Sequence, residues 1–128
     1  MFIAITHNIK VSVESFFQPD YSYPMSQHFM FAYRIRIENN GNDTIQLLRR
    51  HWYIIDAFGA HRELEGEGVV GEQPIIRKTK SYTYVSGCDL KTDLGKMYGT
   101  YLMKNLQTDT LFHVIIPEFV MVAPLKLN

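Results

Sequence analysis

A period of two in the large apolar residues between Phe29 and Glu38 limits the possible folds of this chain more than any other feature. The odd positions are all apolar and large, and from Arg34 onward the even positions are charged. Successive side chains of a strand point to opposite faces, so a period of two predicts a strand with one buried and one solvated face. Five residues form the predicted buried face: Phe29, Phe31, Tyr33, Ile35 and Ile37.

Similar runs recur along the chain, separated by turns rich in Gly, Asn, Asp and Pro. They cover residues 9–17, 45–57, 62–69, 81–86, 95–104 and 111–116, and residues 118–122 supply a further candidate. Seven to eight short strands without a helical period predict an all-β fold, namely an antiparallel two-sheet β sandwich of the immunoglobulin or fibronectin-III type. A length of 128 residues predicts one domain over residues 1–128.

Composition excludes several classes of partner. Thirteen basic residues balance thirteen acidic ones, so we expect no nucleic-acid partner and no membrane association. The single cysteine, Cys88, cannot form an internal disulfide, and no apolar run approaches the roughly 20 residues of a membrane span. Residues 1–7 lack a signal-peptide pattern, so we expect a soluble, cytoplasmic protein. We also predict that it has no cofactor.

A β-hairpin is predicted around Gly59, which suits a left-handed turn position. A two-residue turn would place His51 opposite Gly66, whereas a type I turn with a glycine bulge would shift the pairing by one residue. In either register a bulky strand lies beside glycines 66 and 68. We expect those glycines to leave room for the indole of Trp52, which should belong to the core.

The segment from Gly66 to Gly71 spells G-x-G-x-x-G, the fingerprint of dinucleotide-binding loops. That chemistry needs a preceding strand and a helix that opens at the loop. Pro74 biases the residue before it away from helical dihedral angles, and no helical apolar spacing follows. The glycines therefore indicate a structural role in the backbone of a β protein more strongly than a phosphate site.

Phosphate binding remains the alternative function. Backbone N–H groups of Gly66, Gly68 and Gly71 could bind a phosphate, a pyrophosphate or a nucleotide, with Arg49 or Arg50 of the neighbouring strand adding a charge-assisted bond. Three carboxylates surround this candidate site and oppose an anion: Glu65, Glu67 and Glu72.

Metal binding and catalysis find little support in the spacing of residues. None of the five histidines has a partner at the H-x-x-x-H spacing, and alternating glutamates are typical of a solvated strand face, so we predict no metal site. A lone cysteine such as Cys88 is usually a small buried hydrophobe. No nucleophile motif is present, and we predict a protein that is not an enzyme, with no catalytic residues.

Recognition of another protein suits the sequence best. The segment from Tyr21 to Met25 mixes Tyr, Met and Pro, residues that supply contact area at modest ordering cost. Tyr21, Tyr23 and Met25 are the candidate contacts with an unknown protein partner; the alternative is a loop folded back over the core. A homodimer through an edge strand is also left open.

Four runs in the chain together resemble the ApaG family. They are residues 46–52 (QLLRRHW), 66–74 (GEGVVGEQP), 84–88 (YVSGC) and 97–101 (MYGTY), and they occur in the family's order over almost the whole chain. Phe58 departs from the asparagine typical before Gly59. The resemblance implies a fibronectin-III-like sandwich, found in bacteria as a small protein and in eukaryotes as a module of F-box and polymerase-interacting proteins. It implies no defined reaction, only an association with cobalt tolerance and magnesium efflux that we expect to be indirect.

Overall fold

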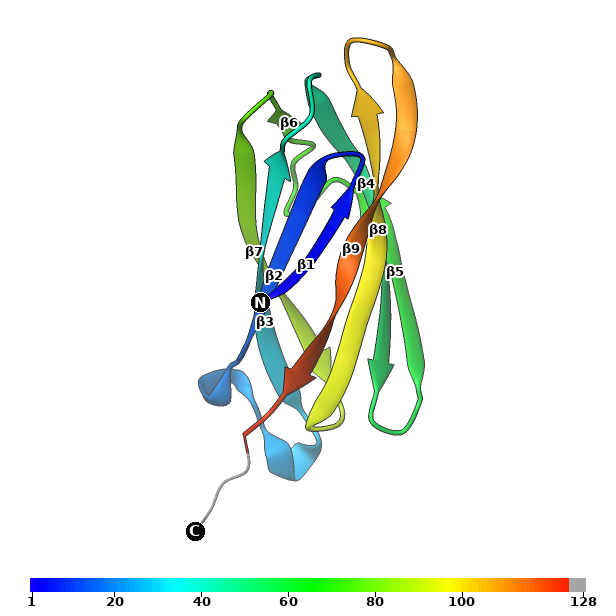
Figure 1. The fold of residues 1–128 in the computed structure, drawn as a ribbon. Helices are drawn as coiled ribbons and strands as arrows, with labels where there is room; N and C mark the ends of the chain where they lie inside the picture. Colours follow the sequence, from blue (N-terminus) through cyan, green and yellow to red (C-terminus); the bar gives the residue numbers. More distant parts are fainter. Residues whose placement is uncertain (125–128) are drawn as a thin grey trace.

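The computed structural model describes residues 1–124 of the chain, which form two antiparallel β-sheets packed face to face (Figure 1). The element order is β1 (Phe2–Thr6), β2 (Ile9–Phe17), β3 (Phe29–Asn39), β4 (Ile45–Asp56), β5 (His61–Glu67), β6 (Ile75–Ile76), β7 (Ser81–Leu90), β8 (Leu94–Asn105) and β9 (Thr110–Val122). Two short 3-10 turns, η1 (Pro19–Tyr21) and η2 (Pro24–Ser26), interrupt the connection from β2 to β3. The predicted all-β sandwich is confirmed.

The strands divide into a sheet of order β1-β2-β3-β7 and a sheet of order β5-β4-β8-β9, with the short β6 paired to β4. Nine strands form within residues 1–124, which is more than the seven to eight predicted. The predicted strands 111–116 and 118–122 are one strand, β9, whose pairing with β8 shifts register between Met97 and Gly99. Strands β1 and β6 were not predicted: β6 has two residues, and β1 is apolar on both of its faces.

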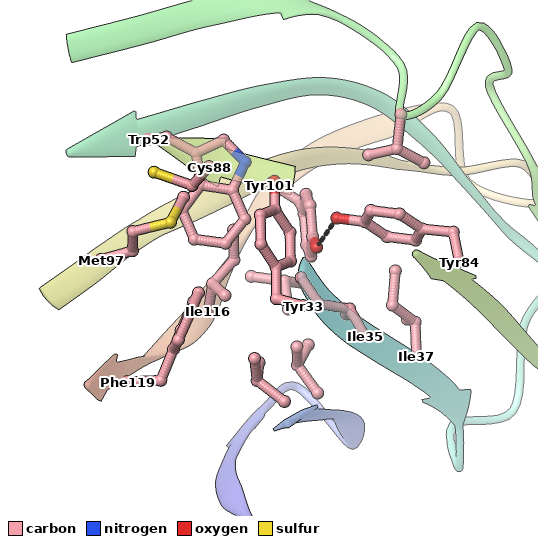
Figure 2. Packing of buried hydrophobic residues seen from close by; sticks show 14 of the residues in the cluster. Tyr33, Ile35, Ile37, Trp52, Tyr84, Cys88, Met97, Tyr101, Ile116 and Phe119 are labelled. Atoms are coloured by element: carbon pink, nitrogen blue, oxygen red, sulfur yellow. Dashed lines mark hydrogen bonds between the residues drawn. The ribbon is translucent and has the colours of Figure 1, made fainter. Parts of the chain in front are cut away.

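The apolar side chains at alternate positions of β3 lie in the core, as expected. Phe31, Ile35 and Ile37 are at most 1% exposed, and they face the second sheet. Trp52 is 2% exposed, and its indole lies edge-on to the rings of Tyr33 and Phe119, at 5.5 and 5.9 Å between centroids. Figure 2 shows this cluster between the sheets. The predicted core position of Trp52 is therefore confirmed.

The hairpin from β4 to β5 has the bulged form of turn, not the two-residue form. Asp56 pairs with Ala60, so the loop has three residues, and Gly59 takes a φ of +82°. Three-residue loops of this kind shift the register by one relative to a two-residue turn. His51 consequently pairs with Glu65, and the register that placed it opposite Gly66 is wrong.

The glycine beside Trp52 is also not the one predicted. Gly99 of β8 pairs with Trp52, and a Cβ at Gly99 would lie 2.0 Å from the carbonyl oxygen of His51. Gly66 instead pairs with Arg50. The close approach of β8 to β4 at the indole therefore depends on Gly99.

Candidate functional site

The G-x-G-x-x-G segment folds as a tight hairpin at the end of β5. Val69 and Glu72 exchange two backbone hydrogen bonds, of 2.8 and 2.9 Å, which leaves Val70 and Gly71 as the two turn residues. Both have positive φ, +44° and +82°, as a type I′ turn requires. No helix follows the segment in residues 1–124, so the dinucleotide-binding context is absent from the described chain.

Gly66 and Gly68 each have a steric reason to be glycine. A Cβ on Gly68 would lie 2.1 Å from the carbonyl oxygen of Glu72, and its φ is +63°. A Cβ on Gly66 would lie 2.9 Å from Nη1 of Arg50. Gly68 therefore allows two backbone segments to approach closely, and Gly66 leaves room for the Arg50 guanidinium, which agrees with a structural role for both glycines.

Arg50 and Arg49 occupy opposite faces of β4. Arg50 pairs with Tyr101 of β8 and shares its inward face, where its Nη1 donates to the carbonyl oxygens of Glu67 and Gly68 at 2.9 and 3.0 Å. Arg49 is exposed on the outer face. The structure thus brings Arg50 to Gly66 and Gly68, but it does not bring Arg49 to them.

A pocket of about 370 Å³ adjoins Arg50 at the open side of the sandwich, between β4 and β7. It is lined by Tyr33, Arg50, Trp52, Glu67, Val69, Val70, Gly71, Tyr84 and Ser86. The guanidinium and the tyrosine and serine hydroxyls could donate to an anion, whereas the carboxylate of Glu67 opposes one. The pocket is therefore chemically mixed.

On the outer face of the same hairpin, an imidazole lies between two carboxylates. His51 Nε2 is 2.5 Å from Oε1 of Glu63, and its Nδ1 is 2.8 Å from Oε1 of Glu65. Only the doubly protonated imidazolium can donate to both. The imidazole also stacks on Tyr53, with ring centroids 4.6 Å apart. The alternation of Glu63 and Glu65 was visible in the sequence, but their contact with His51 depends on the register of the hairpin.

The loop before β3 presents large apolar side chains to solvent. Tyr21 is 67% exposed, Tyr23 is 65% exposed and Met25 is 100% exposed. The alternative of a loop folded over the core is therefore wrong for these three side chains. The loop lies at one end of the sandwich, at the lower left of Figure 1.

The backbone of this loop is nevertheless well bonded. Tyr23 and His28 exchange two backbone hydrogen bonds, of 2.7 and 3.1 Å. The Ser22 hydroxyl donates to the carbonyl oxygen of Gln18 at 2.7 Å and accepts from the amide of Met30 at 2.9 Å. Exposed apolar side chains are thus carried on a backbone with fixed geometry.

Cys88 is buried, as predicted from the sequence. Burial raises the pKa of its thiol to about 11, although the nearby Arg62 guanidinium, 3.3 Å from Sγ, opposes this shift. A thiol of that pKa is almost fully protonated at neutral pH and is a weak nucleophile. Among residues 1–124, no group of three or more His, Cys, Asp or Glu side chains is arranged to hold a metal ion. No helix in the same range is long and apolar enough to cross a membrane.

Comparison with known proteins identifies relatives over nearly the whole chain. Residues 19–105 match the family model described as "ApaG domain". Protein ApaG of Paramagnetospirillum magneticum is 46% identical, over 97% of this chain and 95% of that protein, and Protein ApaG of Brucella anthropi is 44% identical with the same coverage. A crystal structure of the putative ApaA protein of Bordetella pertussis superposes with a TM-score of 0.88 at 38% identity, covering 94% of this chain and 97% of that chain.

Proposed function

For this chain, which belongs to the ApaG domain family, we propose the function of a non-enzymatic module that binds another protein. The observation that carries this proposal is the loop from Tyr21 to Met25, which has a hydrogen-bonded backbone and three exposed apolar side chains. Tyrosine and methionine are enriched at protein interfaces. Preordered geometry lowers the entropic cost of binding, so such a loop is suited to recognition.

A link to cobalt tolerance or magnesium efflux would, on this proposal, act through the protein partner. The module would alter the activity of a transporter or regulator without holding the cation itself. The cytoplasm is the compartment that we propose for it.

Phosphate, pyrophosphate or nucleotide binding at the Gly66–Gly71 segment is the second candidate. The observation in its favour is the inward guanidinium of Arg50 at the rim of the 370 Å³ pocket. Two backbone carbonyls already occupy Nη1 of that guanidinium, and Glu67 lines the same pocket. We therefore rank anion binding below protein recognition.

Affinity capture from a lysate tests the protein-binding proposal. The triple variant Tyr21→Ser, Tyr23→Ser, Met25→Ser should lose a partner that the unaltered chain retains, because its contact area is removed. Its free energy of unfolding should change by no more than about 1 kcal/mol, since the three side chains are exposed. Urea unfolding measures that change.

The matched control is Phe58→Ser, which removes a side chain that is 89% exposed in the turn after β4. This variant should retain the partner. A triple variant that captures the same proteins as the unaltered chain would contradict the proposal. Amide NMR shifts confined to Gly66–Glu72 and Arg50 on addition of pyrophosphate would instead support the second candidate.

A further inference from the structure

Strand β5 is an edge of the five-stranded sheet and pairs only with β4 within residues 1–124. All of its residues except Gly66 are exposed. In Figure 1 it forms the border of the sheet on the right, away from the loop that carries η1 and η2. Edge strands present unpaired N–H and C=O groups, which can pair with an added strand.

Two hydrogen bonds determine which backbone groups of β5 face outward. The amide of Asp56 donates to Ala60 at 3.2 Å, and the amide of Gly68 donates to Leu48 at 2.8 Å. In an antiparallel ladder, only alternate pairs exchange hydrogen bonds. The even-numbered residues 62, 64 and 66 therefore bond to β4, and the N–H and C=O groups of Glu63 and Glu65 point away from the sheet.

The side chains along this edge specify the chemistry of a partner. Glu63 and Glu65 project from the outer face with their side chains 58% and 59% exposed, and Oε1 of each also contacts a ring nitrogen of His51, at 2.5 and 2.8 Å. Leu64 lies between them on the opposite face and is 48% exposed. The edge therefore offers carboxylates on one face at two alternate positions and an apolar contact between them.

We propose that the β5 edge binds an extended basic segment of another protein by strand addition, with Lys or Arg opposite Glu63 and Glu65 and an apolar residue beside Leu64. Residues in directly opposite positions share a face of the sheet, so each basic side chain meets a carboxylate. Backbone pairing supplies affinity and the alternate charges supply register.

The negative charges of Glu63 and Glu65 favour a basic segment over a second copy of this chain or an acidic segment. A second copy of this chain pairing through β5 would place glutamates near glutamates, and like charges opposite each other destabilise a sheet. An acidic segment meets the same repulsion. The proposal concerns a surface distinct from the Tyr21–Met25 loop and does not depend on it.

The test uses the full chain and a blocked synthetic peptide in which Lys alternates with Val and Thr. Titration followed by amide NMR should give saturable shifts in residues 61–67, with affinity that falls as salt is added. Hydrogen exchange of the Glu63 and Glu65 amides should slow by about tenfold or more at saturation. The amides of residues 62 and 64 should change little, because they already bond to β4.

Two controls separate backbone pairing from simple attraction. The same peptide with N-methylated lysine amides keeps its charge but cannot donate to the edge, and it should not slow exchange. The variant Glu63→Gln, Glu65→Gln should bind the unmodified peptide about tenfold more weakly, since it lacks both cross-strand ion pairs. The charge reversal Glu63→Lys, Glu65→Lys should bind an alternating Glu peptide instead.

Three results would overturn the proposal: no saturable shift at millimolar peptide, equal binding of the N-methylated peptide, or shifts confined to the Tyr21–Met25 loop. The last result would still support the loop as a contact surface. If the triple loop variant still captures the same proteins while the β5 edge responds to the basic peptide, the loop proposal is overturned and the edge proposal stands. The two proposed contact surfaces are therefore tested independently.

Discussion

Two tyrosine hydroxyls meet in the interior and satisfy each other across the two sheets. Tyr84 of β7 and Tyr101 of β8 lie with their oxygens 2.5 Å apart, as the dashed line in Figure 2 marks. Burial raises the pKa of both phenols, although the hydrogen bond from Tyr101 partly opposes this for Tyr84. The pair explains how two polar atoms can be buried at little cost, because each provides the partner of the other.

This pair should make the protein sensitive to alkali. The unfolded chain releases phenolic protons near pH 10, whereas the folded chain retains them, so the free energy of unfolding falls as pH rises above about 10. Each such group contributes up to about 1.4 kcal/mol per pH unit. Urea unfolding at pH 9, 10 and 11 should show this slope, and the double variant Tyr84→Phe, Tyr101→Phe should reduce it. Tyr33 and Cys88, whose pKa values burial also raises, will leave a residual slope. An unchanged slope in the double variant would refute the assignment.

The Val69–Glu72 hairpin carries a local conflict between sequence and conformation. Val70 is β-branched, yet its φ is +44°, in the left-handed region that such residues rarely adopt. Its side chain is 54% exposed, so packing contributes little to offset the strain. Strained turns of this kind are maintained by the structure around them, which here includes the Val69–Glu72 bonds and the Arg50 contacts with Gly68.

Replacing Val70 by Asn should stabilise the fold. Asn followed by Gly is favoured in type I′ turns, and the left-handed region costs most L-residues roughly 1–2 kcal/mol. We expect a gain of about 1 kcal/mol in the free energy of unfolding, measured by urea denaturation. The control Gly71→Ala, at a φ of +82°, should lose stability. A destabilised Val70→Asn variant would show that contacts of the valine side chain stabilise the fold by more than its backbone strain costs.

At the scale of the molecule, one buried amide joins the two sheets. Asn39, at the end of β3, is fully buried. Its Nδ2 donates to the carbonyl oxygens of Asp43 and Ile76, both at 2.9 Å, and its Oδ1 accepts from the amide of Gly41 at 3.0 Å. Because Ile76 belongs to β6 of the other sheet, this side chain helps to hold that end of the sandwich together.

Asn39→Asp should therefore be strongly destabilising. The change replaces two N–H donors by a carboxylate oxygen that faces two carbonyl oxygens, and we expect a loss of roughly 3 kcal/mol or more at neutral pH. The shift in the urea midpoint measures the loss. The neighbouring Asn40 is exposed, and Asn40→Asp should change stability by no more than about 0.5 kcal/mol. Equal effects of the two changes would contradict the bridging role of Asn39.

A homodimer through an edge strand stays a prediction. Strand β5 is poorly suited to it, since two copies would oppose their glutamates, whereas β1 carries the exposed apolar residues Ile3 and Ile5. The charge pattern thus directs β5 toward a basic partner.

The class of fold follows from local sequence pattern, because a period of two in β3 can bury one face only in a sheet. Sequence patterns also indicated the core position of Trp52, the buried thiol of Cys88 and the structural role of the glycines. These conclusions depend on local patterns and on the size of individual side chains. A local pattern predicts the buried face of a strand correctly wherever the pairing of the strands is regular.

The composition of the candidate sites depends on tertiary pairing, because irregularities between strands change which side chains share a face. A shift in pairing between Leu47 and Arg49 reverses the phase of β4, so that Arg50, and not Arg49, points inward with Trp52. The three-residue loop at Gly59 then sets Glu63 and Glu65 beside His51. A one-residue slip moves every later side chain to the other face, and only the folded pairing determines where the slips occur.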